Sequence, residues 1–198
     1  FKAPSSSPLD ATLNMLAPPH LQHNPTLRQR GGRTLALATL QSFLSARSLG
    51  YRGGISSPLS APDACSRLSA YLAWGCISMR EVVQTTRDHV AALPEQATRH
   101  RASLLAFLSR LYWHCHFIQK FETECRYETS CINRAYEDMV WENDEANLQA
   151  WMAGRTGVPL IDACMRCLQQ TGWINFRMRA MLVSFLCHHL LIDWRKGV

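Results

Sequence analysis

Long apolar runs are absent from this chain. None reaches the roughly 20 residues that a helix needs to cross a bilayer, and His188, His189 and Asp193 interrupt the longest candidate. The first residues also lack a charged segment followed by an apolar one, which excludes a signal peptide. We therefore expect neither a membrane-spanning nor a secreted protein, and we expect a cytoplasmic location.

Charged residues are also scarce, at 18% of 198 residues against 47% hydrophobic residues. This composition suits one globular domain with a large core, because a chain of this length is short for two domains. The net charge of +6 is uneven: residues 1–54 carry six Lys or Arg against one acid, and residues 55–198 carry fifteen against fourteen. A basic balance permits a phosphate-rich partner, but a solvated basic tail explains it equally well.

Several chemical signatures are missing as well. The sequence has no P-loop, no Rossmann glycine fingerprint and no recognisable nucleophile triad. Its eight cysteines lie mostly in apolar periodic stretches, which is typical of reduced, buried thiols. Cys164 and Cys167 have metal-ligand spacing without a second pair, and His114 and His116 point to different helix faces. We expect no metal site here, since an iron–sulfur or zinc site would need ligands from elsewhere.

The spacing of the apolar residues predicts helices, and no stretch alternates as a strand would. A capping box at Ser78 and Glu81 begins one helix. Pro159 suits the first turn of another helix, which Gly172 ends. The expected helices are Arg33–Ser48 (closed by Gly50), Ser66–Ala73, Ser78–Leu93, Arg101–Phe121, Asp144–Met152, Pro159–Gly172 and Phe176–Trp194.

The expected organisation is therefore an all-α, multi-helix globule. Residues 1–32 are rich in Pro, Ser and Leu and are expected to form an extended linker or N-terminal arm. Residues 33–198 form the helical domain, interrupted by a Gly/Ser/Pro loop at 51–62 and an acidic surface segment at 122–144. We also expect a fragment of a longer protein, because the chain begins with Phe and stops directly after a predicted helix.

Residues Cys65–Ser69 form a candidate anion site. Their hydroxyls and backbone N–H groups stand at the start of a predicted helix, where unpaired donors and the helix dipole favour an anion. Ordinary N-capping explains the same residues, and from this feature alone it is the simpler interpretation.

Arg177 and Arg179 form a second candidate. They are two residues apart on a predicted helix and point about 200° from each other. We expect one to face the core, where a buried arginine needs an acidic or anionic partner, and the other to face the rim.

Three ordered segments carry a resemblance to a known family. Residues Trp151–Lys196 contain the strings GRTG, PLIDACMR, TGW, RMR and DWR, residues Asp63–Ser78 read DACSRLSAYLAWGCIS, and a third segment surrounds Trp113. In this order they resemble the FAD-binding helical domain of the photolyase/cryptochrome family over roughly residues 30–198. The resemblance implies FAD as the cofactor and a domain truncated at its C-terminal end.

The resemblance also implies which residues bind the cofactor. The family's Thr-Ser-x-Leu-Ser pattern, which binds the FAD pyrophosphate, corresponds here to Cys65, Ser66, Arg67, Leu68 and Ser69. Because Cys65 replaces Thr, one hydroxyl is lost and one contact is weakened. Tyr51 corresponds to a tyrosine near the flavin phosphates or the ribityl chain, and Arg179 to an arginine near the isoalloxazine ring. The other expected cofactor-binding residues are Arg110 and Trp173.

Trp113 corresponds to the tryptophan against which a flipped pyrimidine dimer stacks, and photolyases are base-flipping enzymes. The family commonly has Glu three residues before this tryptophan and Arg just after it, where this chain has Arg110 and His114. These departures leave dimer repair open to question. Next to Trp113, His114 is a candidate proton donor.

The resemblance assigns two further groups. Arg177 and Phe176 correspond to positions near the substrate pocket, and many photolyases have His-Asn where this chain has Asn175 and Phe176. Trp194 and Trp141 correspond to the middle and surface tryptophans of a chain that photoreduces the flavin. Each tryptophan taken alone is most simply explained by core packing.

Three functions follow as expectations. The first is light-dependent DNA repair, in which reduced FAD donates an electron to a cyclobutane pyrimidine dimer flipped out of UV-damaged DNA. The second is a cryptochrome-type blue-light photoreceptor that lacks repair activity and acts on a signalling partner. The third is a non-catalytic helical DNA-binding or interaction module. The fold alone does not separate them.

Overall fold

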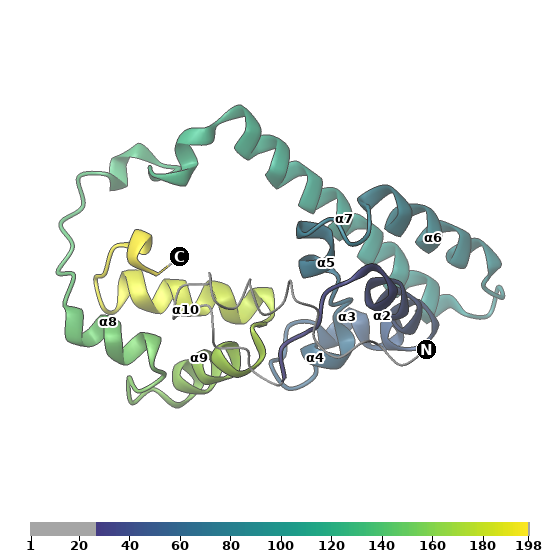
Figure 1. The fold of residues 1–198 in the computed structure, drawn as a ribbon, viewed down its shortest axis with the longest axis horizontal. Coiled ribbons are helices and arrows are strands. Elements are labelled where there is room, and N and C mark those ends of the chain that lie inside the picture. Colours follow the sequence, from purple (N-terminus) through teal and green to yellow (C-terminus); the bar gives the residue numbers. More distant parts are fainter. Residues whose placement is uncertain (1–26, 198) are drawn as a thin grey trace, which may run out of the picture.

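The structure, a computed structural model, describes residues 27–197, so most of the arm expected at residues 1–32 lies outside the described residues. Within this range the chain forms helices and loops without a strand, as the sequence predicts (Figure 1). The helices are α2 (Arg33–Ser45), α3 (Tyr51–Gly54), α4 (Ala61–Ala64), α5 (Ser69–Ala73), α6 (Met79–Ala92), α7 (Thr98–Thr123), α8 (Glu145–Met152), α9 (Pro159–Thr171) and α10 (Phe176–His188). Short 3-10 helices are η2 (Arg47–Gly50), η3 (Cys125–Glu128), η4 (Arg134–Tyr136) and η5 (Trp194–Lys196).

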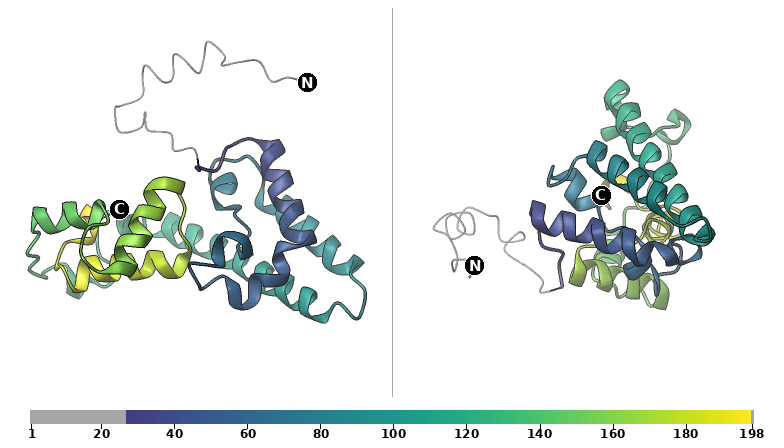
Figure 2. Two further views of the ribbon diagram at one scale, coloured as in Figure 1. Left: turned by 90° about the horizontal axis from the view of Figure 1, so that it is seen from below. Right: turned by 90° about the vertical axis from the view of Figure 1, so that its right-hand side faces the viewer.

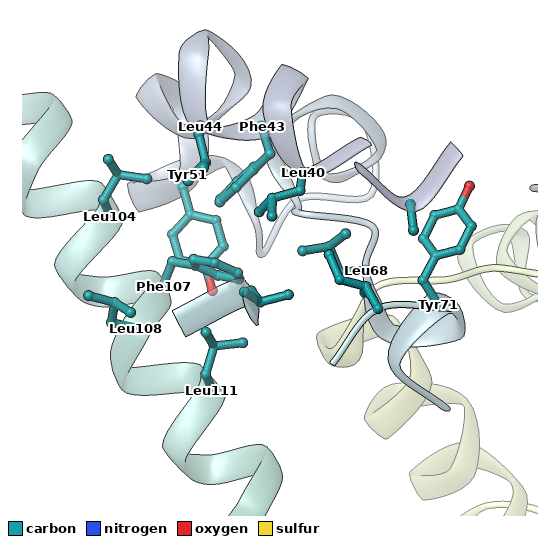
Figure 3. Close-up of a cluster of buried hydrophobic side chains, with 13 residues drawn as sticks. Leu40, Phe43, Leu44, Tyr51, Leu68, Tyr71, Leu104, Phe107, Leu108 and Leu111 are labelled. Atoms are coloured by element: carbon teal, nitrogen blue, oxygen red, sulfur yellow. The ribbon is translucent and has the colours of Figure 1, made fainter. Parts of the chain in front are cut away.

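The first core lies between α2, α6 and the N-terminal half of α7. Figure 3 shows its buried side chains from α2 and α7 together with Tyr51, Leu68 and Tyr71. Phe43, Tyr51 and Phe107 meet edge to face, with ring centroids 4.7–5.8 Å apart. Such aromatic pairs stabilise a core by about 0.5–1.5 kcal/mol beyond their buried area. Leu68, a residue of the candidate anion site, belongs to this core together with Tyr51, so the site is anchored in packed structure.

The second core is built by α8, α9 and α10, on the other side of the molecule (Figure 2). Pro159 begins α9, and Gly172 ends it in the left-handed conformation with φ 66°, which confirms both predicted ends. The chain reaches this core along α7 and through residues 124–144, which are exposed or half-buried. The irregular acidic segment is thus confirmed as a surface connection.

Four predicted helix boundaries are wrong. The first helix ends at Ser45 because Ala46 leaves the helical conformation, and Gly50, with φ −89°, is no left-handed cap. The helix expected from Ser66 begins only at Ser69, and the helix expected from Arg101 begins three residues earlier, at Thr98.

The last helix ends at His188 and not at Trp194. Leu191 has a φ of 49°, and the turn brings Ile192 into the second core, where it is fully buried. The apolar run after His188 predicts a continued helix. Instead the chain reverses direction after His188, and this reversal buries Ile192.

The helices of the described range are all too short or too polar to cross a bilayer.

Candidate cofactor site

The segment Cys65–Ser69 forms a concave group of backbone donors, here called the cradle. Arg67 has the left-handed φ of 63°, and Leu68 follows in the right-handed region with φ −94° and ψ −10°. Successive residues of this kind direct consecutive N–H groups toward one point, where they bind anions. Within residues 27–197, the amides of Ser66, Arg67, Leu68 and Ser69 donate to no protein acceptor.

The side chain of Arg67 extends the cradle toward the second core. Its guanidinium lies over the Trp173 ring, 4.1 Å from the ring centroid. The Oε1 atom of Gln29 accepts a hydrogen bond from Arg67 Nη2 (3.5 Å), and Gln29 Nε2 donates one to the Arg67 carbonyl (2.8 Å). The Nε atom is buried and has no partner in the described chain, and burial lowers the pKa of Arg67. An anion at this place would supply the acceptor that Nε lacks.

Tyr51 is buried against Phe43 and Phe107 in the first core, to which Leu68 of the cradle also belongs (Figure 3). Burial, helped by Cys65 and opposed by Arg110, raises the pKa of Tyr51 to about 12. The phenol therefore lies near both the cradle and α7, and it stays protonated as a hydrogen-bond donor.

The exposed face of α7 carries the residue expected to stack against a substrate base. Arg110, Trp113 and Phe117 follow one another at helical spacing, so they share a face. Trp113 is 49% exposed, and its ring centroid lies 5.8 Å from that of Phe117. His114 is half-buried, with Nδ1 buried and unpaired among the described residues.

The N-terminal turn of α10 corrects one prediction. Arg177 and Arg179 are both exposed, so the expectation that one faces the core is wrong. Each lies about 100° from Met178 on the helix, and Met178 takes the buried position. Phe176 is 81% exposed beside them.

Asn175 is a further candidate for the site, and no motif in the sequence singled it out. It is 4% exposed, and its Nδ2 donates to the carbonyl of Ile55 (3.0 Å), which joins α10 to the loop after Tyr51. Its Oδ1 is buried without a partner in the described range. Its place directly before the predicted helix start at Phe176 was the available signal, because Asn is favoured there, although its side chain makes no capping hydrogen bond.

Trp141 and Trp194 lie away from the cradle. Both line a cavity of about 490 Å³ with Tyr127, Tyr136 and Cys187, and no cradle residue lines it. Arg195 lies over the Trp194 ring at 5.0 Å and pairs with Asp193 (2.9 Å) and Glu137 (2.8 Å). The two tryptophans expected to act in electron transfer are thus adjacent to one cavity, although they are 53 positions apart in the sequence.

Metal-ligating side chains do not gather in the described part of the chain. No group of three His, Cys, Asp or Glu residues there could hold an ion. All eight cysteines are free thiols, and Cys164 is buried while Cys167 is exposed.

Comparison with known proteins gives consistent matches. A family model described as the FAD binding domain of DNA photolyase matches residues 107–198. A deoxyribodipyrimidine photo-lyase of Alkalihalophilus pseudofirmus is 33% identical over 84% of this chain and 33% of its own length. A cryptochrome DASH of Synechocystis is 32% identical over 100% of this chain and 41% of its own length. The chain therefore spans about a third to two-fifths of the length of these relatives.

Solved structures agree with these matches. The crystal structure of a bacterial class III photolyase from Agrobacterium tumefaciens has a TM-score of 0.75 at 32% identity, over 84% of this chain and 33% of that one. The Synechocystis cryptochrome has a TM-score of 0.75 at 31% identity, over 88% of this chain and 35% of that one. A photolyase from Sulfolobus tokodaii, solved with two FAD molecules, has a TM-score of 0.66 at 34% identity, over 88% of this chain and 35% of that one.

The residues of this site fit FAD. Unpaired amides and the unpartnered Nε of Arg67 form a donor set suited to a diphosphate. Trp173 and Tyr51 add an aromatic face and a phenol donor beside it.

Proposed function

Because this chain belongs to the photolyase/cryptochrome family, in the region of its FAD-binding helical domain, we propose that it acts in light-dependent DNA repair. Its cofactor is FAD. Bound in reduced form, FAD would supply the photoexcited electron donor that splits a cyclobutane pyrimidine dimer and recovers the electron. The residues below would bind and orient FAD and the DNA lesion.

The observation that carries the proposal is the donor set of the cradle. The amides of Ser66 and Arg67 would donate to the pyrophosphate, together with the Arg67 guanidinium and the Ser66 and Ser69 hydroxyls. Charge-assisted bonds of this kind are about twice as strong as neutral ones. Tyr51 would donate its phenol proton from the buried side.

The α7 face would receive the lesion. Trp113 presents an exposed aromatic ring on the same face of α7 as Arg110. A base extruded from a duplex is held by stacking on such a ring. Phe176 and Arg177 are exposed at the start of α10 and would contact the DNA, and the net charge of +6 favours a phosphate backbone.

A cryptochrome-type photoreceptor is the second candidate. The observation that favours it is the pair beside Trp113: Arg110 is a cation where the family commonly has a carboxylate, and His114 replaces Arg. A carboxylate accepts hydrogen bonds from a dimer, whereas a guanidinium only donates them. The cavity lined by Trp141 and Trp194 would serve light-driven reduction of the flavin in either function.

The test is repair of an oligonucleotide that carries one cyclobutane thymine dimer. Protein loaded with reduced FAD is mixed with the oligonucleotide under blue light and in darkness, and the dimer is quantified by chromatography. Loss of the dimer only under light supports repair. An intact dimer with folded, FAD-loaded protein would reject this substrate and favour the photoreceptor, and protein unable to hold FAD would favour a non-catalytic module.

A further inference from the structure

Arg47 sits behind the cradle and is surrounded by five acceptors, as many as a guanidinium has N–H groups. The acceptors are the Ser42 hydroxyl (3.1 Å) and the carbonyls of Thr39 (3.0 Å), Asp63 (3.3 Å), Cys65 (2.5 Å) and Ser66 (3.2 Å). We propose that Arg47 is a positioning residue that aims the cradle amides at a diphosphate. This inference rests on the proposed binding of FAD by the cradle.

The planarity of the peptide bond connects Arg47 to those amides. In a trans peptide the carbonyl of one residue and the N–H of the next point in opposite directions. Because Arg47 binds the carbonyls of Cys65 and Ser66, the N–H groups of Ser66 and Arg67 point away from it. Gln29 holds the Arg67 carbonyl in the same way, which turns the N–H of Leu68 outward. Three consecutive peptide planes are thereby fixed.

The positive charge of Arg47 also favours an anion at the cradle. No carboxylate accepts a hydrogen bond from it within residues 27–197. Burial and the neighbouring Arg67 lower the pKa of Arg47, while Asp63 and Cys65 oppose this. A half-buried cation without a counter-ion is costly, and here five hydrogen bonds offset the cost. Two guanidinium groups at one loop favour a ligand with more than one negative charge.

The interruption between α2 and η2 delivers Arg47 to this place. Ala46 breaks the helix with φ −139°, and Arg47 turns back over the last part of α2, where it contacts the Phe43 ring at 5.5 Å. Through Thr39 and Ser42 the cradle is tied to α2, which carries buried residues of the first core. The cradle is therefore held in one shape before a ligand binds, which lowers the entropy cost of binding.

If Arg47 only stabilised the loop, its contacts would be the same. The test therefore compares a ligand that has a pyrophosphate with one that lacks it. FAD and riboflavin, which lacks the pyrophosphate, are titrated by flavin fluorescence into wild type and Arg47→Gln. Arg47→Gln removes the charge and the hydrogen bonds that orient the cradle amides, so FAD binding is expected to weaken about tenfold or more. Riboflavin binding is expected to stay within about twofold of wild type. Arg47→Lys keeps the positive charge but loses the planar set of guanidinium donors, so an intermediate FAD affinity is expected.

Arg101→Gln is the matched control, because Arg101 also bonds two carbonyls, those of Val90 (2.8 Å) and Leu93 (2.9 Å), away from the cradle. Its FAD-to-riboflavin affinity ratio should equal that of wild type. Equal weakening of both ligands by Arg47→Gln, or no weakening, overturns the inference. Should Arg47→Gln lose its helical circular dichroism, Arg47→Lys is judged by the same ratio. Wild type that does not bind FAD overturns the proposed function itself.

Discussion

Arg67 is the residue at which backbone and side chain both depart from the usual. Its φ of 63° costs about 1–2 kcal/mol for a residue with a Cβ, and its Nε is buried without a partner in the described chain. Strain of this kind persists where the surroundings over-determine it, as at ligand sites. Here Gln29, Arg47 and Trp173 hold the conformation.

Two substitutions separate the strain from the guanidinium. Arg67→Gly and Arg67→Ala both remove the side chain, but only Ala retains the Cβ that disfavours a positive φ. We expect Arg67→Gly to be more stable than Arg67→Ala by about 1 kcal/mol, while both lose FAD affinity. Urea unfolding and flavin titration measure the two effects. Equal stabilities would show that φ at this position relaxes at no cost.

His89 predicts a pH dependence of stability. Its ring lies 5.6 Å from that of His100, and Nε2 is buried without a partner in the described range. Burial lowers the pKa of His89, His100 lowers it further, and the Leu44 carbonyl opposes both. Because the folded pKa is the lower one, the unfolded chain binds the proton first as the pH falls below roughly 6.5.

Stability is therefore full above that pH and declines as the pH falls toward the folded pKa. Melting temperatures measured between pH 8 and pH 5.5 should fall less steeply for His89→Gln than for wild type. His116→Gln, an exposed position, is the control and should follow wild type. Parallel curves for all three proteins would contradict the prediction.

At the scale of elements, the turn before α9 explains the GRTG string. The Asp162 carboxylate accepts bonds from Thr156 N and Oγ1 (both 2.7 Å) and from Gly157 N (3.0 Å). These bonds, that of the Thr156 hydroxyl first, lower the pKa of Asp162. Gly154 packs against the same helix: a Cβ there would lie 2.8 Å from the Asp162 carbonyl oxygen.

Gly154→Ala and Gly75→Ala form a matched pair. Both glycines have nearly the same left-handed φ, 63° and 65°, but nothing lies within 4 Å of a Cβ at Gly75. We expect Gly75→Ala to cost about 1 kcal/mol for the backbone alone, and Gly154→Ala to cost clearly more because α9 must move. Urea midpoints measure both. A cost at Gly154 no larger than at Gly75 would mean that the contact with α9 yields freely.

At the scale of the whole molecule, two cores meet around the cradle. The contacts between them include the Arg67–Trp173 stack and the Asn175–Ile55 hydrogen bond. The cradle therefore belongs to the first core through Leu68 and contacts Trp173, which lies between α9 and α10 of the second core. Binding of FAD is expected to stabilise the two together, because a ligand stabilises whichever state binds it.

The cavity beside Trp194 gives a prediction at this scale. Trp194→Phe should slow the light-driven reduction of bound FAD and leave FAD affinity unchanged, since Trp194 lines a cavity that no cradle residue lines. Absorbance under blue light with an external reductant follows the reduction. Trp74→Phe, at an 85% exposed position outside this cavity, is the control. Wild-type rates in Trp194→Phe would remove this residue from the electron path.

The sequence by itself determined the helical class and those helix ends that are set by residues within one helical turn. Ser78 accepts from the Glu81 amide as the capping box predicts, and Pro159 and Gly172 begin and end α9. These signals are local, because a cap is made by residues three or four positions apart. The family strings likewise pointed to Cys65–Ser69 without any knowledge of contacts.

Only the tertiary structure decided what residues distant in sequence do to one another. Burial of Ile192 ends α10 at His188, and burial of Met178 leaves Arg177 and Arg179 both exposed. The hold of Arg47 on the cradle joins residues 18 and 19 positions apart. No local pattern encodes such contacts, because each is selected by the packing free energy of the whole core and not by the propensity of its own segment.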